Sequence, residues 1–299
     1  MVPGARAFPL VFRSIPRPLV LLLAASAVGA HARSQSTTFL VPSRFEAASG
    51  SKLEVHVELG AGGALSPAAW PSGALEQFYV RTAGTQWNLP DAAPARPEDA
   101  FVAVDLGDPD AAMIGLDRRP WIESVPGAKL REFLEKNVEA SSLPEGWKAR
   151  TEADNLRVRH LDSAKLLVRS LRGATVGEPE RLPGSATSAS RAGQRSEIKV
   201  IVDPTVMALG SDLPLRVSWS DSKDPDATIL ALHVPSGTAS SVRAQRGNGW
   251  IRIDRAGRWQ LEVHRARRLA EDAGADFEIE TATLVFSVPE PRKSPGRGR

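Results

Sequence analysis

The fold is decided by the stretch Trp259-Gln260-Leu261-Glu262-Val263-His264, in which apolar and polar residues alternate strictly. Successive side chains of a β-strand point to opposite faces, so such a stretch has one apolar and one polar face. We therefore expect a strand with its apolar residues in the core and with Glu262 and His264 on the outward face. The same alternation over residues 52–59 predicts a second strand, with His56 on its outward face.

Period-two alternation recurs along both halves of the chain, with turns rich in Pro and Gly between the alternating segments. The second half contains about seven such segments in about ninety residues, a density typical of immunoglobulin-like sandwiches. These segments are Glu197–Asp203, Leu213–Ser218, Ile229–Val234, Ser241–Gln245, Trp250–Asp254, Trp259–His264 and Thr281–Val288. We predict a C-terminal immunoglobulin-like sandwich over residues 197–289.

The first half predicts an N-terminal β domain over residues 36–172 that contains one short helix. Its expected strands are Thr38–Val41, Leu53–Leu59, Gln77–Thr82, Phe101–Leu106, Ala112–Leu116 and Lys165–Ser170. The helix is expected at about residues 128–140, where Leu130, Phe133 and Leu134 fall on one helical face. The predicted fold class is therefore mostly β, with two β-sandwich-like domains.

Residues 1–32 have the pattern of a secretory signal peptide. A basic stretch without acidic residues precedes the apolar run Leu19–Ala25, and small residues follow it. That run is far shorter than the ~20 residues that cross a bilayer, so we expect no membrane-embedded segment after cleavage. Cleavage after Ala30 would leave His31 as the first residue, whereas cleavage after Ala32 would remove it. The expected location is periplasmic or secreted.

The remaining regions and the charge balance narrow the possible functions. Residues 173–196 are rich in Gly, Ser, Ala, Pro and Arg, which predicts a linker or long loop, and residues 290–299 predict a disordered basic tail. Of the 38 Lys and Arg residues, three precede residue 31 and four follow Pro291. The segment between these positions therefore has 31 basic and 35 acidic residues. This acidic body has no basic face for nucleic acid, so we expect no nucleic-acid partner.

Catalytic and cysteine chemistry have no support in the sequence. The chain has no cysteine, so an exported form must be stable without disulfides. It contains no Gly-x-Ser-x-Gly elbow, no His-Glu-x-x-His helix and no phosphate-binding loop of the Gly-x-x-x-x-Gly-Lys type. We therefore predict that the protein is not an enzyme.

The histidines are the best candidates for a binding site. Residues two apart on one strand face lie about 7 Å from each other, so Glu262 and His264 could border the same ion or groove. Imidazole and amine nitrogens suit late first-row metals, and His31 at a mature N-terminus would offer both. The alternative is that His56, His264 and Glu262 are ordinary polar residues of a strand surface. For His160 and His233 a structural role is the expectation.

Several segments, in this order, resemble a family of exported proteins known as domain-of-unknown-function family 4198, which includes periplasmic nickel-uptake proteins of the NikK type. The segments are Thr38–Phe45, Arg119–Glu123, Lys129–Glu135, Lys165–Val168, Ala256–Trp259, Val263-His264, Gly274–Phe277 and Thr283–Phe286. The resemblance implies a two-part, mostly β periplasmic protein with an immunoglobulin-like C-terminal domain. It also implies that a histidine exposed by signal cleavage, here His31, is a metal ligand, and that His264 matches the histidine of the closing strand.

Two functions follow as expectations, and an unrecognised hydrolase is a third alternative because fold does not fix function. The first is a periplasmic, non-enzymatic binding protein for nickel or cobalt that supports uptake and passes the ion to a membrane transporter component. Its metal site would be drawn from His31, His264, Glu262 and His56. The second is an extracytoplasmic immunoglobulin-like interaction module that uses no metal.

Overall fold

The computed structural model describes residues 37–48, 50–61, 64–82, 85–89, 94, 100–106, 111–171, 187, 189–221 and 226–290. The predicted signal peptide, His31, most of the 173–196 segment and the basic tail beyond Glu290 lie outside these residues. The described residues belong to one compact unit.

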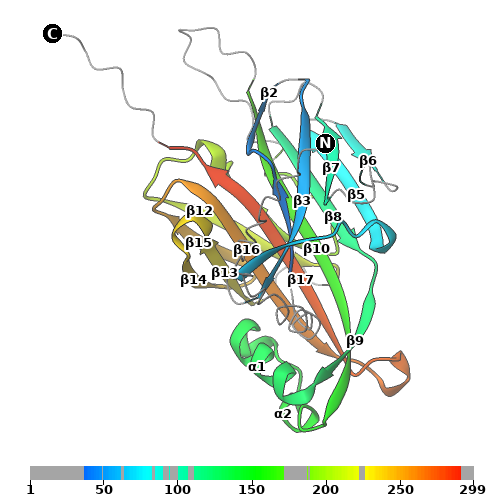
Figure 1. Ribbon diagram of the computed structural model, residues 1–299. Helices are drawn as coiled ribbons and strands as arrows, with labels where there is room; N and C mark the ends of the chain where they lie inside the picture. The colour runs from blue at the N-terminus through cyan, green and yellow to red at the C-terminus, as the bar shows by residue number, and fades with distance from the viewer. Residues whose placement is uncertain are drawn as a thin grey trace, which may run out of the picture. The chain divides into compact units, whose positions relative to one another are not determined.

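The protein is mostly β, as predicted, and its central feature is a ten-stranded sheet (Figure 1). Its main path runs, from one edge to the other, β14 (Thr238–Ala244), β13 (Ala227–His233), β16 (Gly257–Arg268), β17 (Phe277–Val288), β10 (Asn155–Leu171), β8 (Ala111–Arg118), β5 (Leu75–Thr82) and β6 (Thr85–Asn88). Two further strands, β2 (Glu46–Ala48) and β9 (Trp121–Pro126), pair along β10. Strands from both predicted domains therefore share this sheet.

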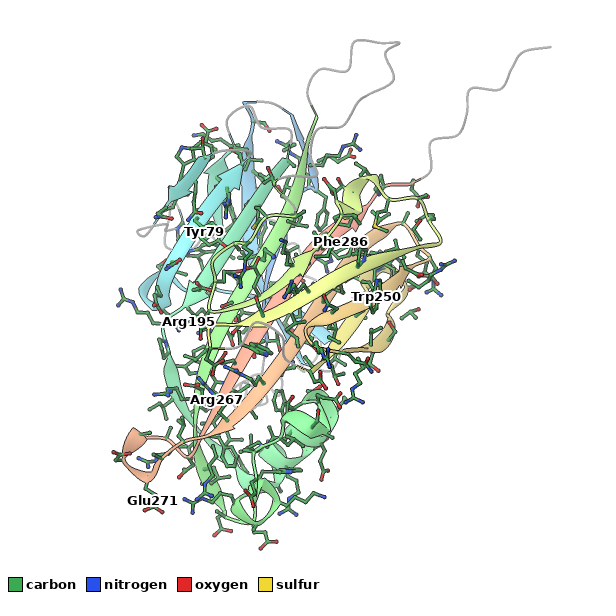
Figure 2. All side chains as sticks on the ribbon, turned by 180° about the vertical axis from the view of Figure 1, so that it is seen from behind. Tyr79, Arg195, Trp250, Arg267, Glu271 and Phe286 are labelled. Carbon is green, nitrogen blue, oxygen red and sulfur yellow. The ribbon has the colours of Figure 1, made fainter. Side chains whose placement is uncertain are left out.

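The C-terminal part forms an immunoglobulin-like sandwich. Its seven strands divide into the four at one end of the large sheet and a separate three-stranded sheet of β11 (Ser196–Val200), β12 (Ser211–Trp219) and β15 (Asn248–Ile253). Their facing side chains form one apolar core, which includes Val217, Ile251, Leu261 and Phe286. In Figure 2, which is seen from behind, the yellow-green and yellow strands of the smaller sheet cross in front of the long strands.

A four-stranded sheet covers the opposite face of the large sheet. It consists of β1 (Thr37–Pro42), β3 (Lys52–Ala61), β4 (Ala64–Ala68) and β7 (Phe101–Asp105). The alternation along β17 shows that the two small sheets lie on opposite sides, because Leu284 and Phe286 belong to the C-terminal core whereas Val285 belongs to the core under β1. The two sandwiches thus share one central layer, with β10 and β17 covered on both faces.

A third apolar cluster lies under the helix α1 (Gly127–Asn137), close to the predicted position. Leu130 and Leu134 are fully buried there, against Phe277 of β17. Gly127 begins the helix at a tight approach, because a Cβ atom at this position would lie 2.2 Å from the carbonyl oxygen of Ala153. Within the described ranges, α2 (Trp147–Arg150) is a further short helix, and 3-10 turns lie at Ser72–Ala74, Ala140–Ser142, Pro204–Val206, Val234–Ser236 and Glu271–Ala273.

The 17-residue strand β10 is much longer than the predicted Lys165–Ser170. It pairs in parallel with β17 and antiparallel with β9 and β8, which makes it the strand that joins the two halves. Its first half carries the charged residues Arg157 and Arg159, which resemble a solvated run in the sequence. In the fold Arg159 forms an ion pair of 2.6 Å with Glu278, so its charge is compensated inside the sheet.

Candidate functional site

The prediction that Glu262 and His264 face outward is wrong. The side chain of His264 is only 2% exposed and that of Glu262 is 20% exposed. Their face of β16 is covered because the large sheet has layers on both sides, here the start of β1 and the helix α1. Period-two alternation separates two faces of a strand but does not show what lies against either of them.

The structure does bring Glu262 and His264 together. His264 Nε2 lies 3.8 Å from Glu262 Oε2, and His264 Nδ1 lies 3.1 Å from Thr281 Oγ1 on the neighbouring strand β17. Phe133 of helix α1 packs edge-on against the imidazole, with ring centroids 5.0 Å apart. The imidazole is therefore held by three neighbours, and Nε2 is the nitrogen that faces the carboxylate.

Glu262 is an ionised carboxylate at neutral pH. Burial raises its pKa, but the neighbouring His264, a hydrogen bond from Thr37 and the charge of Lys136 outweigh that effect and hold the pKa of Glu262 below its usual value. Thr37 is the first residue of β1. Glu262 thus lies where the N-terminal segment of the chain enters the fold.

Further buried polar groups continue along the same face of the sheet. Asp162 of β10 accepts a hydrogen bond of 2.8 Å from Thr38 Oγ1, and Arg118 Nη1 lies 3.8 Å from its carboxylate. Burial raises the pKa of Asp162, while Arg118 and Thr38 act in the opposite direction. We call the buried groups Thr38, His160, Asp162, Glu262, His264 and Thr281 the polar seam. It borders both the core under β1 and the apolar cluster under α1.

His160 belongs to the seam as a neutral imidazole. Its ring stacks on Trp121 at a centroid distance of 5.0 Å, and the guanidinium of Arg118 lies 4.1 Å from the centroid of the same indole. Burial, with the charge of Arg118 as a second cause, lowers the pKa of His160 to about 4. Its Nε2 lies 3.7 Å from Glu123, and at neutral pH this contact joins a carboxylate to an uncharged ring. His160 therefore has a packing role, as the sequence predicts.

The other predicted metal ligands are not part of this pair. His56 is half-buried on β3, where its ring packs against Phe101 at a centroid distance of 5.4 Å. His31 lies outside the described residues. In the described part of the chain, no three His, Cys, Asp or Glu side chains gather as a metal-binding group. Glu262 and His264 are thus the two predicted ligands that the structure brings together.

A cavity of about 450 Å³ opens beside Glu262. Its lining comes from five regions: β1, the β3–β4 hairpin, helix α1, the strand pair β13–β14, and β16. The lining includes Phe39, Leu65, Lys136, Leu230, Gln260 and Glu262. Gln260 is 2% exposed, and neither its Oε1 nor its Nε2 has a hydrogen-bond partner among the described residues. In the sequence, Gln260 falls on the same polar strand face as Glu262 and His264. No local pattern of residues indicates the cavity.

A second buried polar group lies on the opposite face of the large sheet, under β11. Lys165 is fully buried and its Nζ lies 2.8 Å from Glu197 Oε1. Nearby, burial raises the pKa of Asp117 to about 6, and the hydroxyl oxygen of Tyr79 has no hydrogen-bond partner in the described structure. These groups are enclosed between two sheets, so we assign them a structural role.

Comparison with known proteins does not place the chain in a family. No family model matches the sequence, and no curated protein matches it. Among solved structures, it is similar to a calcium-stabilised adhesin with which an Antarctic bacterium binds ice, at 9% identity and a TM-score of 0.22, over 85% of this chain and 49% of the adhesin. It is also similar to murine CEACAM1b, at 10% identity and a TM-score of 0.17, over 85% of this chain and 99% of that one. The chain spans about half the length of the adhesin.

None of the helices in the described ranges has the length and apolar character needed to cross a bilayer.

Proposed function

We propose that the chain is an exported, non-enzymatic binding protein whose cargo is nickel or cobalt, which it presents to a membrane transporter component. The observation that carries the proposal is the Glu262–His264 pair, a carboxylate 3.8 Å from an imidazole nitrogen, at the entry of the N-terminal segment into the fold. Export itself rests on the signal pattern of residues 1–32.

The surroundings of His264 fit a metal-ligating imidazole. Such histidines usually hold their second ring nitrogen in a hydrogen bond, which fixes the tautomer and the ring orientation. Thr281 Oγ1 occupies that position at Nδ1 and leaves Nε2 for an ion. The ionised Glu262 beside it supplies an oxygen donor of opposite charge to the metal.

The missing donors would come from the mature N-terminus. Cleavage after Ala30 would give His31 a free amine next to its imidazole, a combination that suits late first-row metals. His31 stands six positions before Thr37 in the sequence, and the side chain of Thr37 forms a hydrogen bond with Glu262.

The test is calorimetric titration of nickel into exported protein whose mature N-terminus has been determined by mass spectrometry. We expect one ion per chain, with affinity at least about tenfold lower in His264→Gln and in His31→Gln, because each substitution removes one of few ligands. His56→Gln is the matched control, since His56 lies against Phe101 and should not affect binding. Unchanged affinity in His264→Gln would overturn the proposed site.

A second candidate function is a metal-independent interaction module. The observation that favours it is Trp250 of β15, which is labelled in Figure 2 and is 59% exposed. A hollow beside it is lined by Arg252, Asp254 and Ser240. Exposed indoles are common contact residues in protein interfaces. A partner recovered from an envelope extract equally well with and without chelator, and lost in Trp250→Ser, would favour this function.

A further inference from the structure

We propose that the cavity beside β16 is a binding site for an uncharged amphipathic small molecule that carries an amide group, with Gln260 as the residue that recognises the amide. This site goes beyond the proposed metal function, because its main recognition residue is neither Glu262 nor His264. Three features support this site: a carboxamide without a hydrogen-bond partner among the described residues, the charge balance of the cavity and its apolar wall.

The carboxamide of Gln260 is the strongest indication of a ligand. Both of its polar atoms are buried and have no partner in the part of the chain that the structure describes, whereas nearly all buried polar side chains in folded proteins are hydrogen-bonded. A carboxamide offers one acceptor oxygen and two N–H donors side by side. A second amide, which presents the same pair in the complementary order, would satisfy both atoms at once.

The charges around the cavity indicate an uncharged ligand. Glu262 is the carboxylate of the lining; it lies beside His264 and accepts a hydrogen bond from Thr37. Lys136 is the lysine of the lining, and its positive charge lowers the pKa of Glu262, so the two charges compensate each other. A ligand with a net charge would lose its hydration on entering the cavity and would find no uncompensated charge in the lining to replace it. An uncharged ligand does not have this cost.

The apolar body of the ligand would contact the apolar side chains of the lining. These include Phe39 of β1, Leu65 of β4 and Leu230 of β13. Phe39 and Leu65 approach each other over Gly60, where an added Cβ would lie 2.7 Å from Phe39 Cε2 and 3.0 Å from Leu65 Cδ2. A cavity of about 450 Å³ with an apolar wall and a few polar groups is within the size range of small-molecule sites.

The experiment uses N-acetyl-L-leucinamide as the probe and follows the side-chain amide resonances of the 15N-labelled protein. We expect saturable shifts of the Gln260 resonance at millimolar probe, and affinity about tenfold lower in Gln260→Leu, since that variant loses the paired hydrogen bonds. Gln86→Leu is the matched control, because Gln86 is exposed on β6. N-acetyl-L-leucine and L-leucinamide, which each carry one charge, should bind more weakly than the probe.

The variants separate this site from the metal site. Gln260→Leu should keep its nickel affinity and its fold, because it replaces two unpaired polar atoms by apolar ones. His264→Gln should keep its affinity for the probe. Leu65→Trp provides an independent test, since the larger side chain would fill the cavity and abolish probe binding. Absence of a Gln260 shift at the highest soluble probe concentration, or stronger binding of a charged analogue, would overturn the proposal.

Discussion

The substitution Asp117→Asn should change how the stability of the protein depends on pH. Asp117 is 3% exposed, and Gln194 Nε2 donates to its Oδ1 at 3.3 Å. Burial raises its pKa from 3.8 to about 6, so the folded state holds the carboxyl proton more tightly than the unfolded state does. The stability from this group is complete below pH 3.8 and is lost as the pH rises to about 6.

The size of the effect follows from the two pKa values. The interval from 3.8 to about 6 corresponds to about 3 kcal/mol, at about 1.4 kcal/mol for each pH unit. Asparagine keeps an acceptor oxygen for Gln194 but has no proton to lose. Part of this amount is already lost at pH 4, so we expect the free energy of unfolding of Asp117→Asn, relative to wild type, to increase by about 2.4 kcal/mol between pH 4 and pH 7.

The assay is urea unfolding of both chains at pH 4 and pH 7, followed by circular dichroism. Comparison of the variant with wild type is essential because His160 has the opposite dependence. Its pKa of about 4 lies below the usual 6.5, so its contribution is present above pH 6.5 and is lost as the pH falls to about 4. Asp212→Asn, at a 58% exposed side chain, is the control. A difference between Asp117→Asn and wild type that stays constant from pH 4 to pH 7 would refute the reasoning.

Two further predictions concern the core. Gly115→Ala should lower the free energy of unfolding by roughly 1–3 kcal/mol in urea titrations, because the new Cβ would lie 2.1 Å from the buried Tyr79 ring. Gly73→Ala is the control, since a Cβ at Gly73 would have no atom within 4 Å and should change the free energy of unfolding little. Lys165→Met should cost about 3–5 kcal/mol, since it leaves the carboxylate of Glu197 buried without its cation, and the second substitution Glu197→Gln should recover part of that loss. Equal stabilities of Gly115→Ala and Gly73→Ala would contradict the tight packing at Gly115. Equal stabilities of Lys165→Met with and without Glu197→Gln would contradict the role of the Lys165–Glu197 ion pair.

The strands of the C-terminal sandwich could be predicted because each strand is indicated by the alternation of apolar and polar residues within its own short segment. Stretches such as residues 259–264 alternate with period two, and each of the seven predicted segments contains part of an observed strand. The first half of β10 was missed because Arg157 and Arg159 look like a solvated charged run. Their compensating acids, Asp276 and Glu278, come from a segment that is 119 residues away in the sequence.

The candidate site could be predicted only in part. Glu262 and His264 share a strand face, so their proximity followed from spacing, but their burial depends on β1 and α1, which pack there from distant parts of the chain. The unpaired state of Gln260 depends on five separate regions that surround one cavity. Such features arise from tertiary packing and have no signature in a short window of sequence.

The most direct test of the proposed metal function is nickel K-edge X-ray absorption of the exported, nickel-loaded protein, with mature N-terminus verified. We expect nitrogen and oxygen ligands with imidazole scattering from two histidines, and the loss of one imidazole in His264→Gln but none in His56→Gln. A spectrum that is identical in wild type and His264→Gln would contradict the proposed function.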